Sequence, residues 1–359
     1  MNYCILPKNN IRIDFFITYS EIIQNNTPYI SCSTSNYLYD IISQLGKITD
    51  IDTKNNLIKL LNPHEYVNTI VDGYDISVSK FNYNSNFWFE LTEIICSSDI
   101  IFNYLNQRDN LNIYIISTET DVSPFNLINE NISKNISKNI TGMNNDTNTL
   151  LEYFICNQEQ RNIDFCIFSF NDVDYLDTNT YIINMLVTLQ IIITHQTIGS
   201  STIIKIDNIC NKIIVEIIYI YASIYDKVCI IKPIVSNIMS NTRYLVCTHL
   251  NVNVIPLKAQ IKNIIQPIIK SRNIGKITSI LKNTIPIFFL NKLEDINVNI
   301  THQQLEAYDN IINLYKMETN DSKLEVKKRQ NILKCIHWCE KYKIPHNKFL
   351  DKVNIFLHP

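Results

Sequence analysis

Cysteine and histidine side chains that could bind a metal ion gather near the end of the chain. Cys335, His337, Cys339 and His346 supply nitrogen and sulfur donors, the ligand types of structural zinc sites. Cysteines four residues apart share one face of a helix, whereas His337 points roughly opposite to both. Zinc ligands usually stand on turns at two-residue spacing. We therefore interpret the two cysteines as buried helix residues and predict no metal site, with a Cys₂His₂ site as the alternative.

Three further residues have side chains suited to proton transfer or ligand binding. Lys205 ends an apolar, strand-like run, where its amine either takes part in catalysis or reaches solvent past the sheet edge. Glu119 follows another apolar, strand-like run. Its carboxylate either binds a ribose hydroxyl or is an ordinary solvated loop carboxylate. His195 follows a long apolar run and precedes Gly199, which favours a helix-capping role over that of a base.

A cluster of basic residues lies within the C-terminal 40 residues. Two interpretations stay open: a patch that faces RNA, or a solvated helix face partnered by Glu325. The cluster consists of Lys323, Lys327, Lys328, Arg329, Lys334, Lys341, Lys343 and Lys348.

The composition excludes several classes of protein. Among 359 residues, 32 Lys and Arg stand against 34 Asp and Glu, so the net charge of −2 excludes a general electrostatic nucleic-acid binder. Hydrophobic residues make up 46%, which excludes wholesale disorder. The ten cysteines are scattered, mostly within apolar runs, as in a reducing compartment. The start MNYCILPKNN resembles no secretory signal, and apolar runs end before 18 residues, so we expect a cytoplasmic protein.

Apolar segments alternate between strand-like and helix-like spacing. This alternation predicts an α/β fold with a mostly parallel sheet and helices on both faces. The last two strands are separated by only about ten residues without a helical pattern, so we expect them to pair antiparallel. The expected strands are 111–116, 163–168, 202–206, 227–231 and 243–250, and the expected helices are 86–97, 149–156, 181–195 and 210–224.

Two changes of composition suggest the domain organisation. Residues 129–149 contain Asn-Ile-Ser-Lys twice in tandem, are polar and of low complexity, and are predicted to form a surface loop inserted in the sheet domain. Beyond Pro256 the spacing becomes helical and continues to Ile344-Pro345, where a helix should end. We therefore expect an N-terminal extension (1–75), a sheet domain (76–250) and a helical C-terminal region (251–359).

The segment from Lys232 to Cys247 carries the most specific motif. This segment resembles the FtsJ/RrmJ-type ribose 2′-O-methyltransferases. The resemblance lies in Lys232-Pro233, in Ser236 and in the run Thr242-Arg243-Tyr244-Leu245-Val246-Cys247. Residues 200–206 resemble the strand that carries the central lysine of that family. Residues 62–67, 87–95 and 335–345 are similar to its cap-directed branch in eukaryotes and large DNA viruses. The resemblance implies a Rossmann-like class I methyltransferase sheet, parallel with a terminal antiparallel hairpin, followed by a helical C-terminal region.

The same resemblance implies a Lys-Asp-Lys-Glu catalytic set, of which this sequence keeps one member. The central lysine corresponds to Lys205, whereas Glu90, Ser169 and Thr242 stand at the other three positions. Lys232-Pro233 and Ser236 are interpreted as shaping the turn between the last two strands, with Ser236 hydrogen-bonded to the backbone.

The cofactor of the family is S-adenosylmethionine, and we expect this chain to lack the turn that binds it. Family members follow the first strand with an acid and a Pro-Gly-Gly turn, because glycine lets the backbone approach the cofactor. Residues 115–125 contain no glycine, and Val122 places a branched Cβ there. Glu119 and Asp121 are the residues that would have to bind the cofactor if it binds at all.

These observations lead to two functional hypotheses. The first is a catalytically degenerate methyltransferase homologue that acts as a scaffold or stimulatory subunit in viral mRNA capping or transcription. The second is an active cap 2′-O-methyltransferase that uses Lys205 with S-adenosylmethionine. The expected partners are another viral capping or transcription protein, or capped RNA, in the host cytoplasm or the virion, and no membrane.

Overall fold

A computed structural model describes residues 2–20, 28–81, 83, 85–97, 110–117, 137–143, 162–170, 177–271, 276–316 and 321–348. The chain forms two compact units, each built from separate stretches of sequence. The sheet unit comprises residues 1–35, 98–232 and 241–299, and the helical unit comprises residues 36–97, 233–240 and 300–359. These units do not coincide with the three consecutive segments expected from the sequence, because the helical unit combines N-terminal, central and C-terminal stretches.

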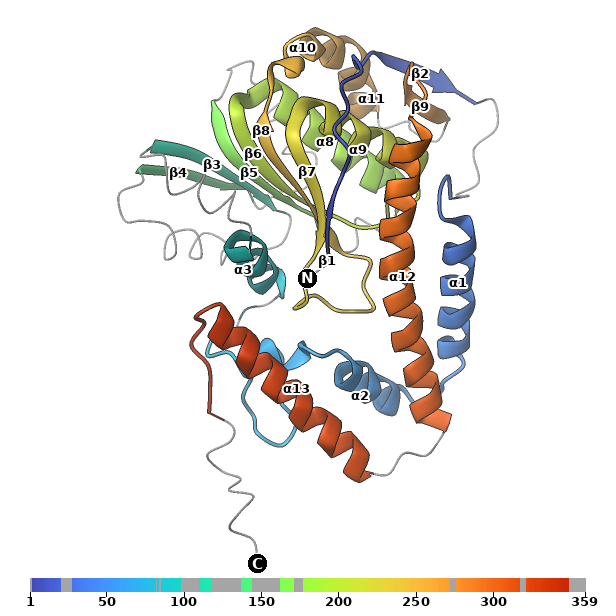
Figure 1. The fold of residues 1–359 in the computed structure, drawn as a ribbon, viewed down its shortest axis with the longest axis vertical. Coiled ribbons are helices and arrows are strands. Elements are labelled where there is room, and N and C mark those ends of the chain that lie inside the picture. Colours follow the sequence, from blue (N-terminus) through green and yellow to red (C-terminus); the bar gives the residue numbers. More distant parts are fainter. Residues whose placement is uncertain are drawn as a thin grey trace, which may run out of the picture. The chain divides into compact units, whose positions relative to one another are not determined.

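The sheet unit contains a mixed seven-stranded sheet in the order β1-β7-β8-β6-β5-β3-β4 (Figure 1). β3 is parallel to β4 and β5, and β5 is parallel to β6. β8 is antiparallel to both neighbours, and β1 is antiparallel to β7. The strands are β1 (Asn2–Ile5), β3 (Asn110–Ser117), β4 (Ser137–Met143), β5 (Ile163–Ser169), β6 (Gln196–Ile206), β7 (Tyr225–Lys232) and β8 (Arg243–Leu250).

The predicted α/β class and the antiparallel pairing of the last two strands are confirmed. β7 and β8 pair from Tyr225↔Leu250 to Ile231↔Tyr244. β8 also pairs with β6, so the reversed strand lies between two strands that run parallel to each other. The expected helix over 149–156 lies outside the described residues.

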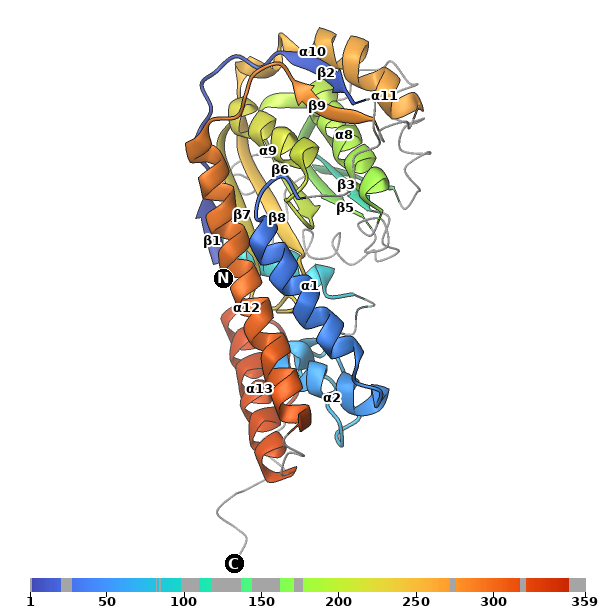
Figure 2. The same ribbon diagram turned by 90° about the vertical axis from the view of Figure 1, so that its right-hand side faces the viewer.

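Two apolar helices pack beside this sheet, α8 (Thr178–His195) and α9 (Lys212–Ile224) (Figures 1 and 2). Almost every residue of α9 is buried, as is usual for a helix that is apolar on all sides. Both helices begin with a side-chain cap: Asp177 accepts from Asn179 and Thr180, and Asn211 accepts from Ile213. The caps place the two helix starts where the sequence pattern predicted them to within a few residues.

Two segments differ from the sequence-based prediction. Residues 137–143 form β4, a parallel neighbour of β3, although they lie inside the segment predicted as a loop. A two-stranded sheet pairs β2 (Phe15–Tyr19) with β9 (Ile277–Leu281), although the sequence after Pro256 was predicted to be helical. The sequence pattern did not predict these strands because Ile and Asn are abundant along the whole chain. Residues that occur everywhere are weak indicators of strands and turns.

The rest of the sheet unit consists of short helical segments and parts of two longer helices. The short segments are Val252–Val254, α10 (Leu257–Gln260), a π-helical turn (Ile261–Ile265) and α11 (Gln266–Ser271). Helices α1 (Cys32–Gly46) and α12 (Ile287–Lys316) contribute residues to both units.

The helical unit contains α2 (Ile51–Leu61), a 3₁₀ turn (Glu65–Val67), α3 (Phe87–Ser97) and α13 (Asp321–Lys341). The last helix ends before Ile344-Pro345, as predicted. One apolar cluster joins α1, α2, α12 and the 233–240 segment through Leu45, Leu57, Met239, Ala307, Ile311 and Ile312. Among the described residues, every helix of the chain is too short or too polar to span a bilayer.

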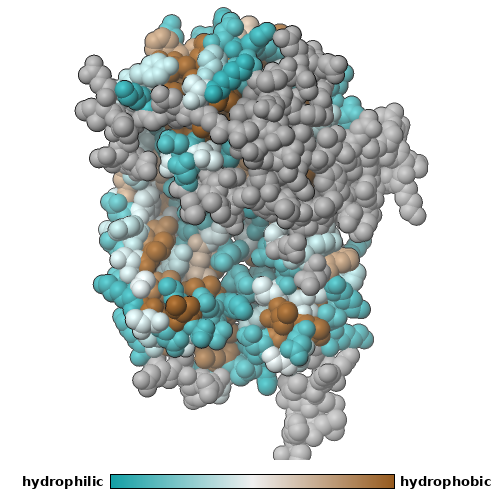
Figure 3. Space-filling model, turned by 180° about the vertical axis from the view of Figure 1, so that it is seen from behind, coloured by the Kyte–Doolittle hydropathy of each residue, from teal (hydrophilic) through white to brown (hydrophobic). Residues whose placement is uncertain are grey.

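Exposed apolar side chains are distributed over several places. The face shown in Figure 3 is mainly hydrophilic, with separate apolar patches. In the helical unit the exposed large apolar residues include Tyr37, Tyr39, Ile42, Ile51, Ile70 and Ile76. Scattered residues of this kind need no binding partner to explain them.

Candidate functional site

The predicted catalytic positions of the sheet unit meet at one edge of the sheet. We call this the carboxyl edge: β5, β6 and β7 end there and β8 begins there. The strand register fixes it, since Phe168 pairs with Ile204 and Ile206 pairs with Arg243. Ser169, Lys205 and Thr242 therefore belong to one edge, as their correspondence to a single catalytic set requires.

The chemistry available at these three positions is limited. Lys205 is 6% exposed and Ser169 is fully buried, and Lys205, Ser169 and Thr242 all interact with other groups. Serine and threonine hydroxyls are neutral at physiological pH and cannot hold a proton as a carboxylate does. Neither hydroxyl can therefore take the acid-base role that the aspartate or the glutamate of a Lys-Asp-Lys-Glu set would have.

Glu90, which stands at the fourth position, lies on α3 in the helical unit. It is 6% exposed and interacts with other groups. Only three of the four predicted positions therefore share a compact unit.

A buried arginine at the carboxyl edge was not singled out from the sequence. Arg243 donates from Nη1 to Oδ1 of Asn297 at 2.8 Å and from Nε to the carbonyl oxygen of Asn241 at 3.0 Å. Burial lowers the pKa of Arg243, and the charge of Asp207 opposes this shift. The only sequence signal was an arginine at the start of an otherwise buried strand.

The Lys-Pro motif shapes the turn between β7 and β8, as predicted. Lys232 Nζ donates to the carbonyl oxygen of Thr242 at 3.4 Å, and its side chain is almost fully buried. Ser236 Oγ donates to the carbonyl oxygen of Pro233 at 2.7 Å. Lys232 therefore adds a second lysine to the carboxyl edge.

The predicted cofactor residues Glu119 and Asp121, and Val122 with them, lie outside the described residues. The described part of β3 ends at Ser117, whose backbone pairs with that of Ser169. The described part of β3 therefore ends at the carboxyl edge.

In the helical unit, a buried carboxylate joins three of the segments that carry the family resemblance. Glu93 on α3 is fully buried and accepts three N–H donors. These are the backbone amides of Ile234 at 2.9 Å and Val235 at 3.2 Å, and the Trp338 indole at 3.0 Å. A carboxylate with several N–H donors gains strong, charge-assisted hydrogen bonds. Glu93 therefore fixes α3, the 233–240 segment and α13 relative to one another.

Residues 62–67 are held in the same unit by side chains of α13. Asn331 Nδ2 donates to the carbonyl oxygen of Leu60 at 2.6 Å, and the Cys335 thiol donates to that of Pro63 at 3.7 Å. His64 is largely buried: desolvation, with a smaller contribution from the charge of Lys334, lowers its pKa to about 4. These contacts pack the segment that ends at residue 67 against α13.

The cysteines near the C-terminus are buried helix residues, as interpreted. Cys335 and Cys339 are fully buried, and burial raises both pKa values, that of Cys339 to about 12. The side chain of His337 is 84% exposed. Within the described residues no three His, Cys, Asp or Glu side chains are grouped as metal ligands.

Two further residues lie at helix ends or helix contacts. Trp338 packs edge-to-face on Phe89 at 6.0 Å between ring centroids and lies 4.8 Å from the Tyr342 ring, so α13 contacts α3 through an aromatic pair. His195 is the last residue of α8 and is buried, which agrees with a place at the helix C-terminus.

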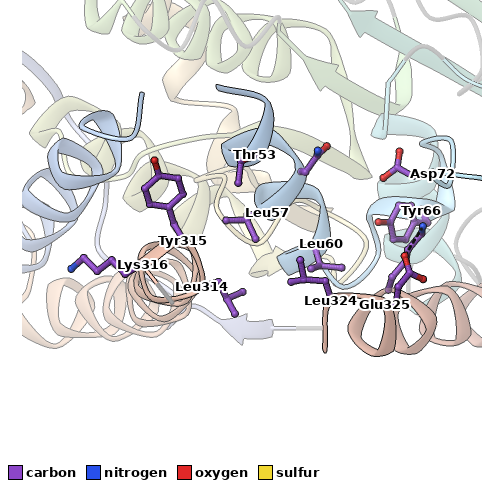
Figure 4. A pocket seen from close by; sticks show the side chains of 12 residues that line it. Thr53, Leu57, Leu60, Tyr66, Asp72, Leu314, Tyr315, Lys316, Leu324 and Glu325 are labelled. Atoms are coloured by element: carbon purple, nitrogen blue, oxygen red, sulfur yellow. Dashed lines mark hydrogen bonds and ion pairs between the residues drawn. The ribbon is translucent and has the colours of Figure 1, made fainter. Parts of the chain in front are cut away.

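A cavity of about 810 Å³ lies between α2, α12 and α13 of the helical unit (Figure 4). Leu57, Leu60, Leu314 and Leu324 form its apolar wall, and Lys328 pairs with Glu325 beside it at 3.5 Å. Burial raises the pKa of Tyr66, which also lines it, to about 12, so the phenol keeps its proton. The lining is mixed, because Thr53, Asn56, Asp72 and Lys316 also face the cavity, and it indicates no particular ligand.

Neither a scan against protein-family models nor a search of curated proteins finds a match to this chain.

Proposed function

We propose that this chain is a non-catalytic subunit built on a methyltransferase-like α/β fold, which binds a protein of mRNA capping or transcription. One observation supports this most directly: the three positions that meet at the carboxyl edge carry Ser169, Lys205 and Thr242. The two hydroxyls stand where the resemblance implies carboxylates.

The residues that would have to bind S-adenosylmethionine, Glu119 and Asp121, lie outside the described residues. The described part of the carboxyl edge carries Lys205, Lys232 and Arg243, and the hydroxyls of Ser169 and Thr242. Residues 115–125, where the resemblance implies a glycine turn for the cofactor, contain no glycine. A methyl-transfer step is therefore not part of the proposed function.

A role in binding is supported by what has been retained. Buried polar contacts hold the helical unit at Glu93 and at residues 62–67. Each such contact costs free energy when it is broken, so their presence fits a protein that must keep its shape without performing catalysis.

The test is a titration of the purified full-length chain with S-adenosylmethionine, followed by an assay of methyl transfer to a short capped RNA. We expect neither saturable binding nor transfer. Binding together with transfer that Lys205→Ala abolishes, while Lys270→Ala on the surface of α11 leaves it intact, would establish the active-enzyme alternative. We also expect Val122→Gly alone to produce no transfer, because Ser169 and Thr242 remain.

A further inference from the structure

The lysines of α13 are arranged in a line along the helix. Lys323, Lys327, Lys334 and Lys341 follow one another at intervals of four, seven and seven residues. At 100° per residue they fall within an arc of about 40°, and they extend over roughly 27 Å. Gln330 and His337 fill the remaining positions of the line. We call these six residues the basic stripe. All are exposed except Lys327, which is half-buried.

The stripe lies beside the buried face of α13 and does not coincide with it. Leu324, Cys335, Trp338 and Cys339 are buried or half-buried, and at 100° per residue they project about 40° to 140° from the middle of the line of lysines, with Trp338 nearest and Cys339 farthest. The lysines are therefore not needed to pack the helix, and their substitution should leave the fold intact.

Two glutamates of α13 pair with neighbours other than the four lysines. Glu325 pairs with Lys328 at 3.5 Å, and Glu340 lies 3.9 Å from His337 of the stripe. Within the described residues, no ion pair involves the four lysines of the stripe. Lys341 lies over the ring of Tyr342 at 5.1 Å from its centroid. From Asp321 to Lys348 there are eight Lys and Arg against three Asp and Glu, in a chain whose net charge is −2.

We infer that the basic stripe binds the phosphate backbone of an RNA strand. A straight row of separate positive charges matches a linear polyanion, and lysine binds phosphate as a point charge. The inference depends on the helical unit alone and stands whether or not the sheet unit is a degenerate methyltransferase.

The experiment measures binding of a fluorescent 20-nucleotide polyuridine RNA to the full-length chain by anisotropy, over a range of salt concentrations. The test variant carries Lys→Gln at positions 323, 327, 334 and 341. The matched control carries the same charge change at Lys262, Lys270, Lys276 and Lys282, all exposed in the sheet unit. Circular dichroism verifies that both variants fold.

We expect the stripe variant to bind at least about tenfold more weakly near 0.1 M salt, and the slope of log K against log salt to become shallower by roughly 3. The control should bind like the wild type. Equal losses in both variants, or no loss in the stripe variant, would overturn the inference. So would displacement of the RNA by a polyglutamate peptide of equal length at equal concentration, which would assign the stripe to an acidic protein.

Discussion

The carboxyl edge of the sheet unit and the interior of the helical unit both contain buried polar groups, but they use them differently. At the edge, Lys205, Lys232 and Arg243 lie where the family resemblance implies an acid-base set. In the helical unit, Glu93 receives three N–H donors from segments far apart in the sequence. The place where the resemblance implies acid-base chemistry carries hydroxyls and basic groups, whereas Glu93, for which no role was expected, holds structure together.

This difference shows that residues resembling a family motif can have a packing role. The Lys-Pro turn and the 335–345 segment, which carried the resemblance, are fixed by hydrogen bonds and buried aromatic contacts. These contacts do not by themselves indicate catalysis.

The largest expected effect is that of Glu93→Gln. All three partners of Glu93 are N–H donors, and the amide nitrogen of glutamine cannot accept a hydrogen bond from any of them. At least one buried donor is therefore left unpaired in the variant. The other donors lose a charged acceptor. We expect the free energy of unfolding to fall by about 3 kcal/mol, measured by urea denaturation. Hydrogen exchange at the Ile234 and Val235 amides should accelerate. The exposed control Glu340→Gln should change neither quantity, and an equal loss there would contradict the role of Glu93.

The next largest effect concerns acid sensitivity. The pKa of His64 is about 4 in the folded chain, below its ordinary value of about 6.5, so the unfolded chain binds the extra proton between these values. The contribution to stability is complete above pH 6.5 and is lost as pH falls towards 4. From pH 7 to pH 5 we expect a loss of about 2 kcal/mol that His64→Gln removes. The exposed control His302→Gln should retain it; if His64→Gln also retained it, another group would be responsible.

A smaller effect is expected for the corresponding substitution in the sheet unit, Glu216→Gln. Glu216 accepts from the Ser279 hydroxyl at 2.6 Å and from the Ile280 amide at 2.7 Å, and Ser279 can also donate to the carbonyl oxygen of Leu281. Glutamine can accept from Ile280 and donate to Ser279, so the network can re-form.

Burial also raises the pKa of Glu216, so its favourable contribution is present at low pH and is lost as pH rises through the folded-state pKa. We expect the free energy of unfolding at pH 7 to change by less than about 1 kcal/mol on substitution. A loss as large as that of Glu93→Gln would remove the distinction between the two units.

The smallest effect is expected on treatment with a chelator. Cys335 and Cys339 are buried thiols with raised pKa values, and metal binding requires thiolates. Incubation with EDTA should shift the urea midpoint by no measurable amount. Stoichiometric zinc in native mass spectrometry, together with a large destabilisation on chelation, would contradict this assignment.

Much of the sheet was predictable because its strands are short apolar runs bounded by polar residues. β5, β7 and β8 lie within two residues of their predicted ends. β6 was predicted too short, since it starts at Gln196 and passes through Gly199 in the left-handed region at φ 84°. That irregularity breaks the period-two pattern on which strand prediction depends.

The sequence by itself determined which segments are apolar enough to be buried, that the last two strands pair antiparallel, and that hydroxyls stand where carboxylates were expected. Only the tertiary structure decided that β8 lies between β6 and β7, that Arg243 meets Asn297, and that Glu93 joins three distant segments. The physical reason is that burial follows from local composition, whereas hydrogen-bond partners far apart in the chain are chosen when the whole unit packs.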